Sequence, residues 1–156
     1  MKAKQIIGNL LMAFLLVSVG VAIGKEMAAA RAKPGTEPVV APGEETVMVY
    51  YMHGIPCLTC TMIDTTAEAL VRDEFAAKVE AGQMKYVSLN YLERENEPLA
   101  DKYNVGSNMI IVARFRDGEE VKRVRLDKVM DLAMQHEQLA DYIRQGIRAC
   151  LEGGRE

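Results

Sequence analysis

The strongest constraint on the fold is an apolar run that leads directly into a Cys-x-x-Cys motif. Residues 46–52 form the run (TVMVYYM), and Gly54 and Pro56 turn the chain before Cys57 and Cys60. A continuous apolar run of this length is typical of a strand that is buried on both faces of a sheet. We therefore expect a central strand that ends at a turn and is followed at once by a helix carrying both cysteines.

The position of the two cysteines at a helix start indicates their chemistry. A helix N-terminus carries roughly half a positive charge and unpaired N–H groups, and both favour a thiolate over a thiol. Residues three apart lie next to each other on one helix face, so Cys57 and Cys60 can close a disulfide. The pattern predicts a redox-active dithiol, and a purely structural pair is the alternative.

Composition excludes several other functions. Hydrophobic residues make up 49% of the 156 residues and charged residues 26%, which suits one globular domain plus an appendage. The net charge of -3 gives no support to a nucleic-acid partner. Three cysteines are too few for a disulfide scaffold, and a zinc site would need both His53 and His136 beside the Cys-x-x-Cys.

Residues 1–31 predict an N-terminal signal-anchor helix. Residues 6–24 are 19 positions without a charge, rich in Leu, Ile and Val. At ~1.5 Å per residue such a transmembrane helix spans roughly 28 Å, close to the hydrocarbon thickness of a bilayer. Secretory signals usually have shorter apolar cores, which favours an uncleaved anchor. Cleavage after the small residues 28–30 is the alternative.

A linker is predicted at residues 32–45, before a domain at residues 46–152. Proline and glycine are dense in it: Pro34, Gly35, Pro38, Pro42 and Gly43. Basic residues flank both ends of the apolar segment, so charge does not decide the membrane orientation. A signal-like start and a disulfide-capable pair favour a single-pass cell-membrane protein whose domain is extracytoplasmic. A secreted or periplasmic protein is the alternative if the signal is cleaved.

Apolar periodicity and turn residues predict the remaining elements. They are, in chain order, a helix at about 57–81 ending near Gly82, a strand at about 84–91, a short helix at about 95–103, strands at about 109–115 and 119–126 joined by Asp117-Gly118, and a helical end at 132–151 with a break near His136. The Asp-Gly hairpin predicts antiparallel pairing for the last two strands. The helical crossovers predict parallel pairing for the first strands.

This β-α-β-α-β-β-α order, with Cys-x-x-Cys at the first strand-to-helix turn, resembles the thioredoxin fold. Residues 99–105 (LADKYNV) look like the short helix and exit of thioredoxins, and residues 110–119 look like their third strand and hairpin. The resemblance implies a three-layer α/β/α domain with a mixed four-stranded sheet. The Tyr-Tyr-Met-His-Gly strand end, the Cys-x-Thr-Cys and the Glu-x-Glu-Asn-Glu loop are similar to a thioredoxin-like family described as subunits of nitrophenyl-compound nitroreductases.

The resemblance also implies roles for the site residues. Cys57 would be the attacking thiolate and Cys60 the resolving thiol, with protein thiols or disulfides as partners and no cofactor beyond the disulfide. His53 and Pro56 are candidate supporting residues. A histidine four positions before Cys57 can stabilise a thiolate or join it in holding a soft metal ion.

Three thioredoxin features are missing from this sequence. The tryptophan before the first cysteine is replaced by Pro56, the buried aspartate six positions before that cysteine is Tyr51, and the cis-proline that faces the dithiol is Met109 or Ile110. In the family that proline keeps metals from the thiols. Its loss favours an alternative in which the dithiol holds a soft ion such as copper(I) or arsenite.

Three functions therefore remain: a membrane-tethered thiol–disulfide oxidoreductase, a soft-ion carrier using Cys57 and Cys60, and a redox subunit of a larger reductase complex. The spacer between the cysteines does not fix the reduction potential, so the direction of exchange stays open. We expect Cys150 to be a buried structural thiol on the apolar face of the last helix, and His136 only to start a helix. Most methionines outside the apolar N-terminal segment are expected to pack in the core.

Overall fold

The computed structural model describes residues 45–152. The anchor helix predicted at 6–24 and the linker predicted before Glu45 lie outside the described residues. Within 45–152, no helix combines the length and the apolar character that crossing a membrane requires. Glu45, predicted as the last residue of the linker, is the first residue of the first strand.

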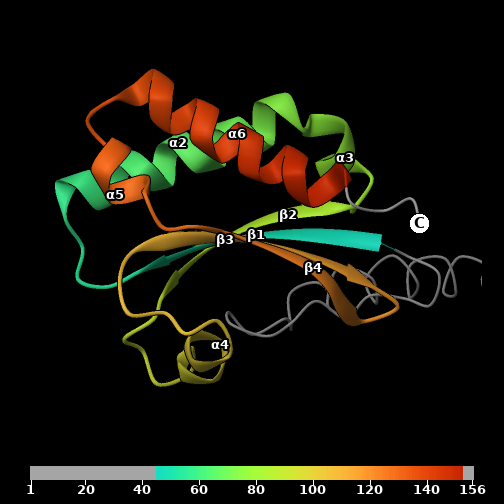
Figure 1. The fold of residues 1–156 in the computed structure, drawn as a ribbon, viewed down its shortest axis with the longest axis horizontal. Coiled ribbons are helices and arrows are strands. Elements are labelled where there is room, and N and C mark those ends of the chain that lie inside the picture. Colours follow the sequence, from blue (N-terminus) through green and yellow to red (C-terminus); the bar gives the residue numbers. More distant parts are fainter. Residues whose placement is uncertain (1–44, 153–156) are drawn as a thin grey trace, which may run out of the picture. The chain divides into compact units, whose positions relative to one another are not determined.

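The described residues form one mixed sheet with helices on both faces (Figure 1). The elements are β1 (Glu45–His53), α2 (Leu58–Glu74), α3 (Ala76–Glu80), β2 (Met84–Asn90), α4 (Glu97–Lys102), β3 (Met109–Arg116), β4 (Glu119–Leu126), α5 (Val129–Leu132) and α6 (His136–Glu152). The strand order is β2-β1-β3-β4, in which β1 is parallel to β2 and antiparallel to β3. This is a thioredoxin-like α/β fold, as the element order implied.

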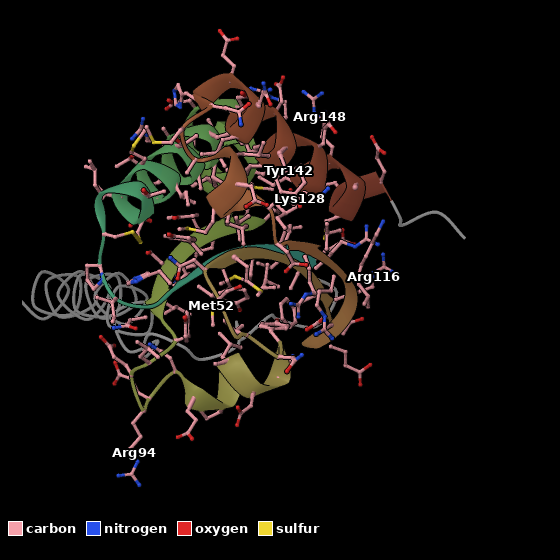
Figure 2. All side chains as sticks on the ribbon, turned by 60° about the vertical axis from the view of Figure 1, so that its left-hand side comes forward. Met52, Arg94, Arg116, Lys128, Tyr142 and Arg148 are labelled. Carbon is pink, nitrogen blue, oxygen red and sulfur yellow. A yellow bond between two sulfur atoms is a disulfide. The ribbon has the colours of Figure 1, made fainter. Side chains whose placement is uncertain are left out.

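β1 is buried on both faces, as its apolar run predicts. Alternate side chains join two separate cores: Val47, Val49 and Tyr51 join the core under α2 and α6, and Met48, Tyr50 and Met52 join the core that includes residues of α4. Met52 lies in the interior in Figure 2, whereas the charged ends of Arg94 and Arg148 are exposed. β1 thus holds the layers together and ends at residues 54–57, which we call the cysteine loop.

The helix predicted at 57–81 is two helices. α2 ends at Glu74, and Phe75 interrupts the helical backbone before α3 starts at Ala76. At ~1.5 Å per residue α2 is about 25 Å long, which already matches the length of the strands beneath it. Residues beyond Phe75 therefore have little sheet to cover, and Val79, although apolar, is 38% exposed. Gly82 ends the segment with a φ of 72°, as predicted.

The pairing of β3 differs from the prediction. Parallel pairing was expected after each helical crossover, yet only β1 and β2 are parallel, and β3 runs antiparallel beside β1. The six residues of α4 extend only about 9 Å. They do not carry the chain back along the sheet. β3 therefore starts at the end of the sheet where β1 ends, with Met109 opposite Met52.

The hairpin between β3 and β4 agrees with its sequence signal. Asp117 and Gly118 have φ values of 54° and 82°, and two consecutive positive φ angles suit the right-handed twist of paired strands. His136 starts α6 after the predicted break.

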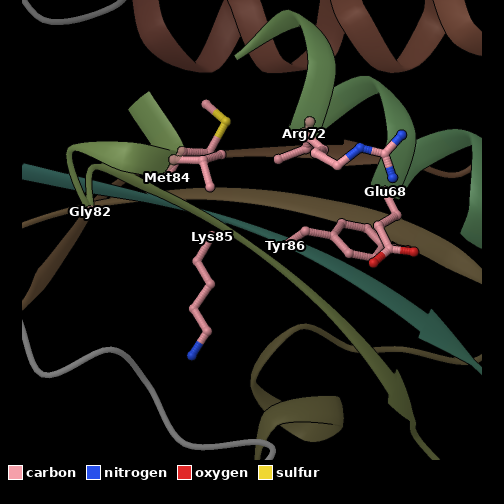
Figure 3. Close-up of a pocket in the computed structure, with 8 residues that line it drawn as sticks. Glu68, Arg72, Gly82, Met84, Lys85 and Tyr86 are labelled. Carbon is pink, nitrogen blue, oxygen red and sulfur yellow. The ribbon is translucent and has the colours of Figure 1, made fainter. Parts of the chain in front are cut away.

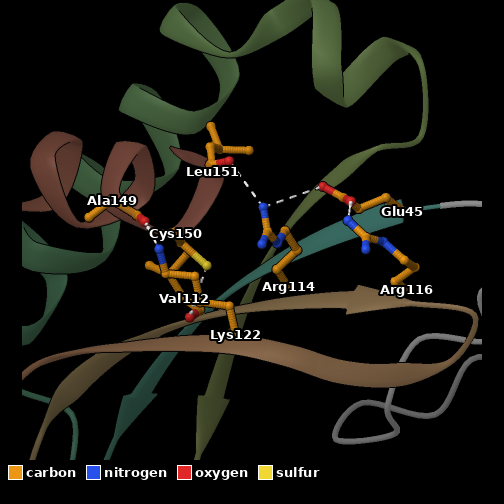
Figure 4. A network of polar contacts seen from close by, with 8 residues as sticks. All are labelled: Glu45, Val112, Arg114, Arg116, Lys122, Ala149, Cys150 and Leu151. Carbon is orange, nitrogen blue, oxygen red and sulfur yellow. Dashed lines mark hydrogen bonds and ion pairs between the residues drawn. The ribbon is translucent and has the colours of Figure 1, made fainter. Parts of the chain in front are cut away.

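Basic side chains of this hairpin bind the C-terminal end of α6 (Figure 4). Arg114, only 3% exposed, donates a hydrogen bond to the Leu151 carbonyl at 3.0 Å and lies 3.8 Å from the Glu45 carboxylate. Lys122 donates to the Ala149 carbonyl. The last carbonyls of a helix lack intrahelical partners and form the negative end of its dipole, so these cations attach α6 to the sheet.

Candidate redox site

Cys57 and Cys60 form a disulfide at the start of α2. Their Sγ atoms are 2.09 Å apart and their Cα atoms 5.0 Å apart. Cys57 is exposed, whereas Cys60 is only 5% exposed. The predicted pair is therefore brought together, and its first sulfur is the one open to a partner.

Cys57 occupies the N-cap position of α2 rather than its first turn. Its backbone is extended, and its Sγ accepts a hydrogen bond from the Cys60 N–H at 3.0 Å. An N-cap side chain normally satisfies a free backbone N–H with oxygen, and here sulfur does so. After reduction, a Cys57 thiolate would accept a hydrogen bond from this N–H and would be stabilised by the positive end of the helix dipole.

Cys60 has a polar partner that sequence reasoning missed. Asn108, the residue before β3, donates from Nδ2 to the Cys60 Sγ at 3.3 Å, and its Oδ1 accepts from the Gly54 N–H at 2.9 Å. The antiparallel register that sets Met109 opposite Met52 brings Asn108 to the cysteine loop. The thioredoxin resemblance sets residues 109–110 opposite the dithiol, but nothing in the local sequence points to a role for Asn108 itself.

Of the two predicted supporting residues, His53 ends β1 and Pro56 directly precedes Cys57. The His53 Nδ1 contacts the Gly54 carbonyl at 3.0 Å, and its ring centroid lies 5.6 Å from that of Tyr51. No hydrogen bond joins His53 to either sulfur within residues 45–152. Pro56 is exposed and directly precedes the N-cap, where it fits a helix that starts at Leu58.

Tyr51, at the position of the buried thioredoxin aspartate, cannot act as a carboxylate base. Its side chain is 1% exposed. Burial, followed by the negative charge of Asp64, raises the pKa of Tyr51 to about 12. Asp64 accepts a hydrogen bond from the Tyr86 hydroxyl at 2.5 Å, and burial first and this bond second raise the pKa of Tyr86 well above its ordinary value. Both hydroxyls stay protonated at neutral pH.

Exposed apolar side chains flank Cys57 in the chain. Ile55 is 78% exposed and Leu58 80%. Met130 accepts from the same Asn108 Nδ2 at 3.6 Å, which places its sulfur near that of Cys60. Met130 and Met134 are 39% and 77% exposed and are exceptions to the predicted packing of most methionines in the core. The prediction is right for Met48, Met52, Met84 and Met109, all of which are buried.

A shallow hollow of about 410 Å³ lies between α2, α3 and β2 (Figure 3). Glu68, Arg72 and Lys85 line it with Tyr86. Neither cysteine lines it, and Cys57 is exposed elsewhere on the surface. The described part of the chain has no group of three or more His, Cys, Asp or Glu side chains arranged to hold a metal ion.

Comparison with known proteins returned structural similarity alone. No family model and no curated protein matches the chain. Thioredoxin-2 of a malaria parasite is 25% identical and covers 59% of this chain and 84% of its own, with a TM-score of 0.36. The thioredoxin of Fasciola hepatica is 21% identical, with coverages of 65% and 83% and a TM-score of 0.37. The thioredoxin of Thermus thermophilus is 18% identical, with coverages of 70% and 77% and a TM-score of 0.39. Because these scores are low, the fold assignment rests on strand order and connections.

Proposed function

We propose that this protein is a thiol–disulfide oxidoreductase that exchanges the Cys57–Cys60 disulfide with protein thiols. One arrangement carries the proposal. An exposed sulfur at the N-cap of a long helix is bonded to a buried sulfur one turn further, in a thioredoxin-like fold. Such a position makes Cys57 the sulfur that a partner attacks and Cys60 the one that leaves or resolves.

The exchange balances without a cofactor. A partner thiolate attacks the Cys57 Sγ, the Cys57–Cys60 bond breaks, and Cys60 leaves as a thiolate. A second partner thiolate then attacks the partner sulfur of the mixed disulfide, and Cys57 leaves as a thiolate. The partner is oxidised by two electrons and the dithiol is reduced by two; the reverse sequence reduces a partner disulfide.

The test is disulfide exchange by the purified full chain with a reduced and an oxidised protein substrate. Cys57→Ser should abolish exchange, and Cys60→Ser should accumulate a mixed disulfide because no resolving thiol remains. Cys150→Ser is the matched control and should exchange normally, since Cys150 is buried elsewhere. Absence of exchange by the wild-type chain in both directions would overturn the proposal.

A second candidate function is the binding of a soft ion such as copper(I) by the reduced dithiol. The contact that favours it is the shared Asn108 donor, which holds the Met130 sulfur near Cys60. Thiolate and thioether sulfur are ligands that copper(I) prefers. If the reduced full chain holds copper(I), Met130→Leu should weaken the binding and Met134→Leu should not. A copper content unchanged by replacing both cysteines with serine would contradict it.

We also infer that the protein is tethered to the cell membrane with its domain outside the cytoplasm. The apolar segment at 6–24 and the disulfide-forming pair support this inference. The intact chain should then sediment with membranes and resist alkaline extraction. A mature protein that begins after Ala30 and remains in the soluble fraction would contradict the anchor.

We also propose, from the sequence resemblance alone, a role as the redox subunit of a larger reductase complex. A tagged chain should then co-purify with a second, cofactor-bearing polypeptide. Recovery of a monomer that exchanges disulfides unaided would contradict this role.

A further inference from the structure

We propose that Asn108 sets the redox balance of the pair by donating a hydrogen bond to the Cys60 sulfur when that sulfur is a thiolate. The inference rests on the proposed function and adds to it a residue that acts directly on a reacting atom. It starts from the contact between Asn108 Nδ2 and Cys60 Sγ at 3.3 Å.

The orientation of the Asn108 amide follows from its second contact. The Gly54 N–H is a hydrogen-bond donor. The oxygen is the only acceptor atom of the Asn108 amide, so Oδ1 must face Gly54. The NH₂ end is then the end that faces the Cys60 sulfur. Because Asn108 directly precedes β3 and Gly54 directly follows β1, this bond also joins the start of one strand to the end of its neighbour.

Burial makes the donor important. Cys60 is 5% exposed, so water gives its sulfur little solvation, and a buried anion without a donor is strongly disfavoured. The other recorded neighbour of this sulfur is the Ile55 carbonyl at 3.7 Å, which can accept from a thiol but cannot stabilise a thiolate. The surroundings of Cys60 therefore provide an acceptor for its protonated form and the Asn108 N–H for its ionised form.

The same contact acts in both directions of exchange. When a partner thiolate attacks Cys57, the bond to Cys60 breaks and the electron pair stays on the Cys60 sulfur, where Asn108 stabilises it. When the dithiol reduces a partner, Cys60 attacks Cys57 Sγ as the thiolate that Asn108 favours. A leaving group that ionises more easily leaves faster and makes the disulfide a stronger oxidant.

Asn108→Asp is the decisive variant. The aspartate keeps an oxygen for the Gly54 N–H but presents a carboxylate oxygen to the sulfur instead of a donor. We expect the equilibrium constant for reduction by glutathione to fall about tenfold, equivalent to a reduction potential about 30 mV more negative. In a Cys57→Ser background, the same change should lower the Cys60 thiolate fraction, measured by thiolate ultraviolet absorbance.

Two further variants control the experiment, all made in the full chain. Ser107→Asp adds the same charge at the neighbouring exposed position and should leave both readouts near wild type. Asn108→Leu removes donor and acceptor without adding charge and should shift both readouts in the direction of Asn108→Asp. It also keeps the test usable if Asn108→Asp folds poorly.

The outcomes separate the two proposals. If Asn108→Asp and Asn108→Leu both leave the thiolate fraction and the glutathione equilibrium within twofold of wild type, the role of Asn108 is wrong while exchange activity stands. A shift with Ser107→Asp equal to that with Asn108→Asp also overturns the hydrogen bond, because bulk charge then explains the effect. If the wild-type chain exchanges no disulfides, the function fails, and the thiolate fraction in the Cys57→Ser background still tests Asn108.

Discussion

Cys150 differs from the other two cysteines in its surroundings. It lies on α6 with no exposed area, and its Sγ is 3.6 Å from the Val112 carbonyl. Burial is the largest cause of a raised pKa of the Cys150 thiol, and the charges of Arg114 and Lys122 offset it in part. The thiol is therefore protonated and shielded at neutral pH, as a structural role predicts.

Alkylation of the reduced native chain should distinguish these environments. A thiol-specific reagent should modify Cys57 first and Cys150 about a hundredfold or more slowly, because access to Cys150 needs local opening of the core. Peptide mass spectrometry over a time course measures both rates. In urea the difference should disappear. Comparable rates in the native protein would show that α6 does not protect Cys150.

Tyr51 should make the protein sensitive to alkali. An unfolded tyrosine ionises near pH 10. Burial, with the charge of Asp64, raises the pKa of folded Tyr51 to about 12. Between these values the unfolded chain binds fewer protons than the folded one, so the free energy of unfolding falls as pH rises. The contribution is complete below about pH 10 and amounts to at most roughly 2–3 kcal/mol.

Tyr51→Phe tests this assignment. The variant keeps the buried ring and removes the ionisable hydroxyl, so its free energy of unfolding should fall less steeply than that of wild type between about pH 10 and 12. Urea unfolding at a series of pH values gives both curves. Tyr142→Phe, at a half-buried surface position, is the control. Parallel wild-type and Tyr51→Phe curves would contradict the assignment.

At the scale of the elements, Arg114 and Arg116 allow a matched comparison. Both lie near the Glu45 carboxylate, at 3.8 Å and 2.9 Å, but Arg114 is buried and also binds the C-terminal end of α6. Arg114→Ala should lower the free energy of unfolding by about 3–5 kcal/mol, because it leaves Glu45 and a helix carbonyl without this partner. Arg116→Ala should cost at most about 1 kcal/mol, as exposed ion pairs usually do.

Chemical denaturation of the two variants measures the difference. Equal losses would mean that the contact with α6 contributes little and that Glu45 alone decides the effect. A larger loss of unfolding free energy for Arg116→Ala than for Arg114→Ala would contradict the prediction that the buried arginine contributes more.

Elements whose signals are local could be predicted from the sequence, and those set by distant contacts could not. The β1 run, the Asp117-Gly118 turn and the break before His136 each depend on neighbouring residues, and all three are confirmed. The end of α2 depends on the length of the sheet beneath it. The direction of β3 depends on how far α4 carries the chain.

The candidate site divides in the same way. Cys57 and Cys60 are found by their spacing after a buried strand, and their disulfide follows. Asn108 comes 48 positions after Cys60 and reaches it only because β3 is antiparallel to β1. The resemblance to thioredoxins sets residues 109–110 opposite the dithiol, but it assigns no role to Asn108, whose contact follows from the side-chain positions in the fold.

For the whole molecule, reduction of the disulfide should lower stability without changing the fold. Two cores on opposite faces of the sheet hold the domain, and most of their members lie outside the cysteine loop. Closing so short a loop contributes about 2 kcal/mol to the free energy of unfolding through the entropy of the unfolded chain.

Urea unfolding with and without a reductant tests this expectation. The variant with both Cys57 and Cys60 replaced by serine should match the reduced wild type. Near-ultraviolet circular dichroism should be alike in the oxidised and reduced forms. Loss of this signal on reduction would show that the disulfide is required for packing.

The short path of α4 has a consequence for how such a domain can diversify. Since β1 and β3 fix the sulfurs and Asn108 through their pairing, the exposed residues 106–107 can lengthen or change composition without altering the register, whereas Tyr103 is fully buried in the core. A deletion of one residue inside β3 is different, because side chains alternate between the two faces of a sheet and the shift would turn Asn108 away. Insertions before Asn108 would thus change the surface next to this residue while Cys57, Cys60 and Asn108 keep their positions.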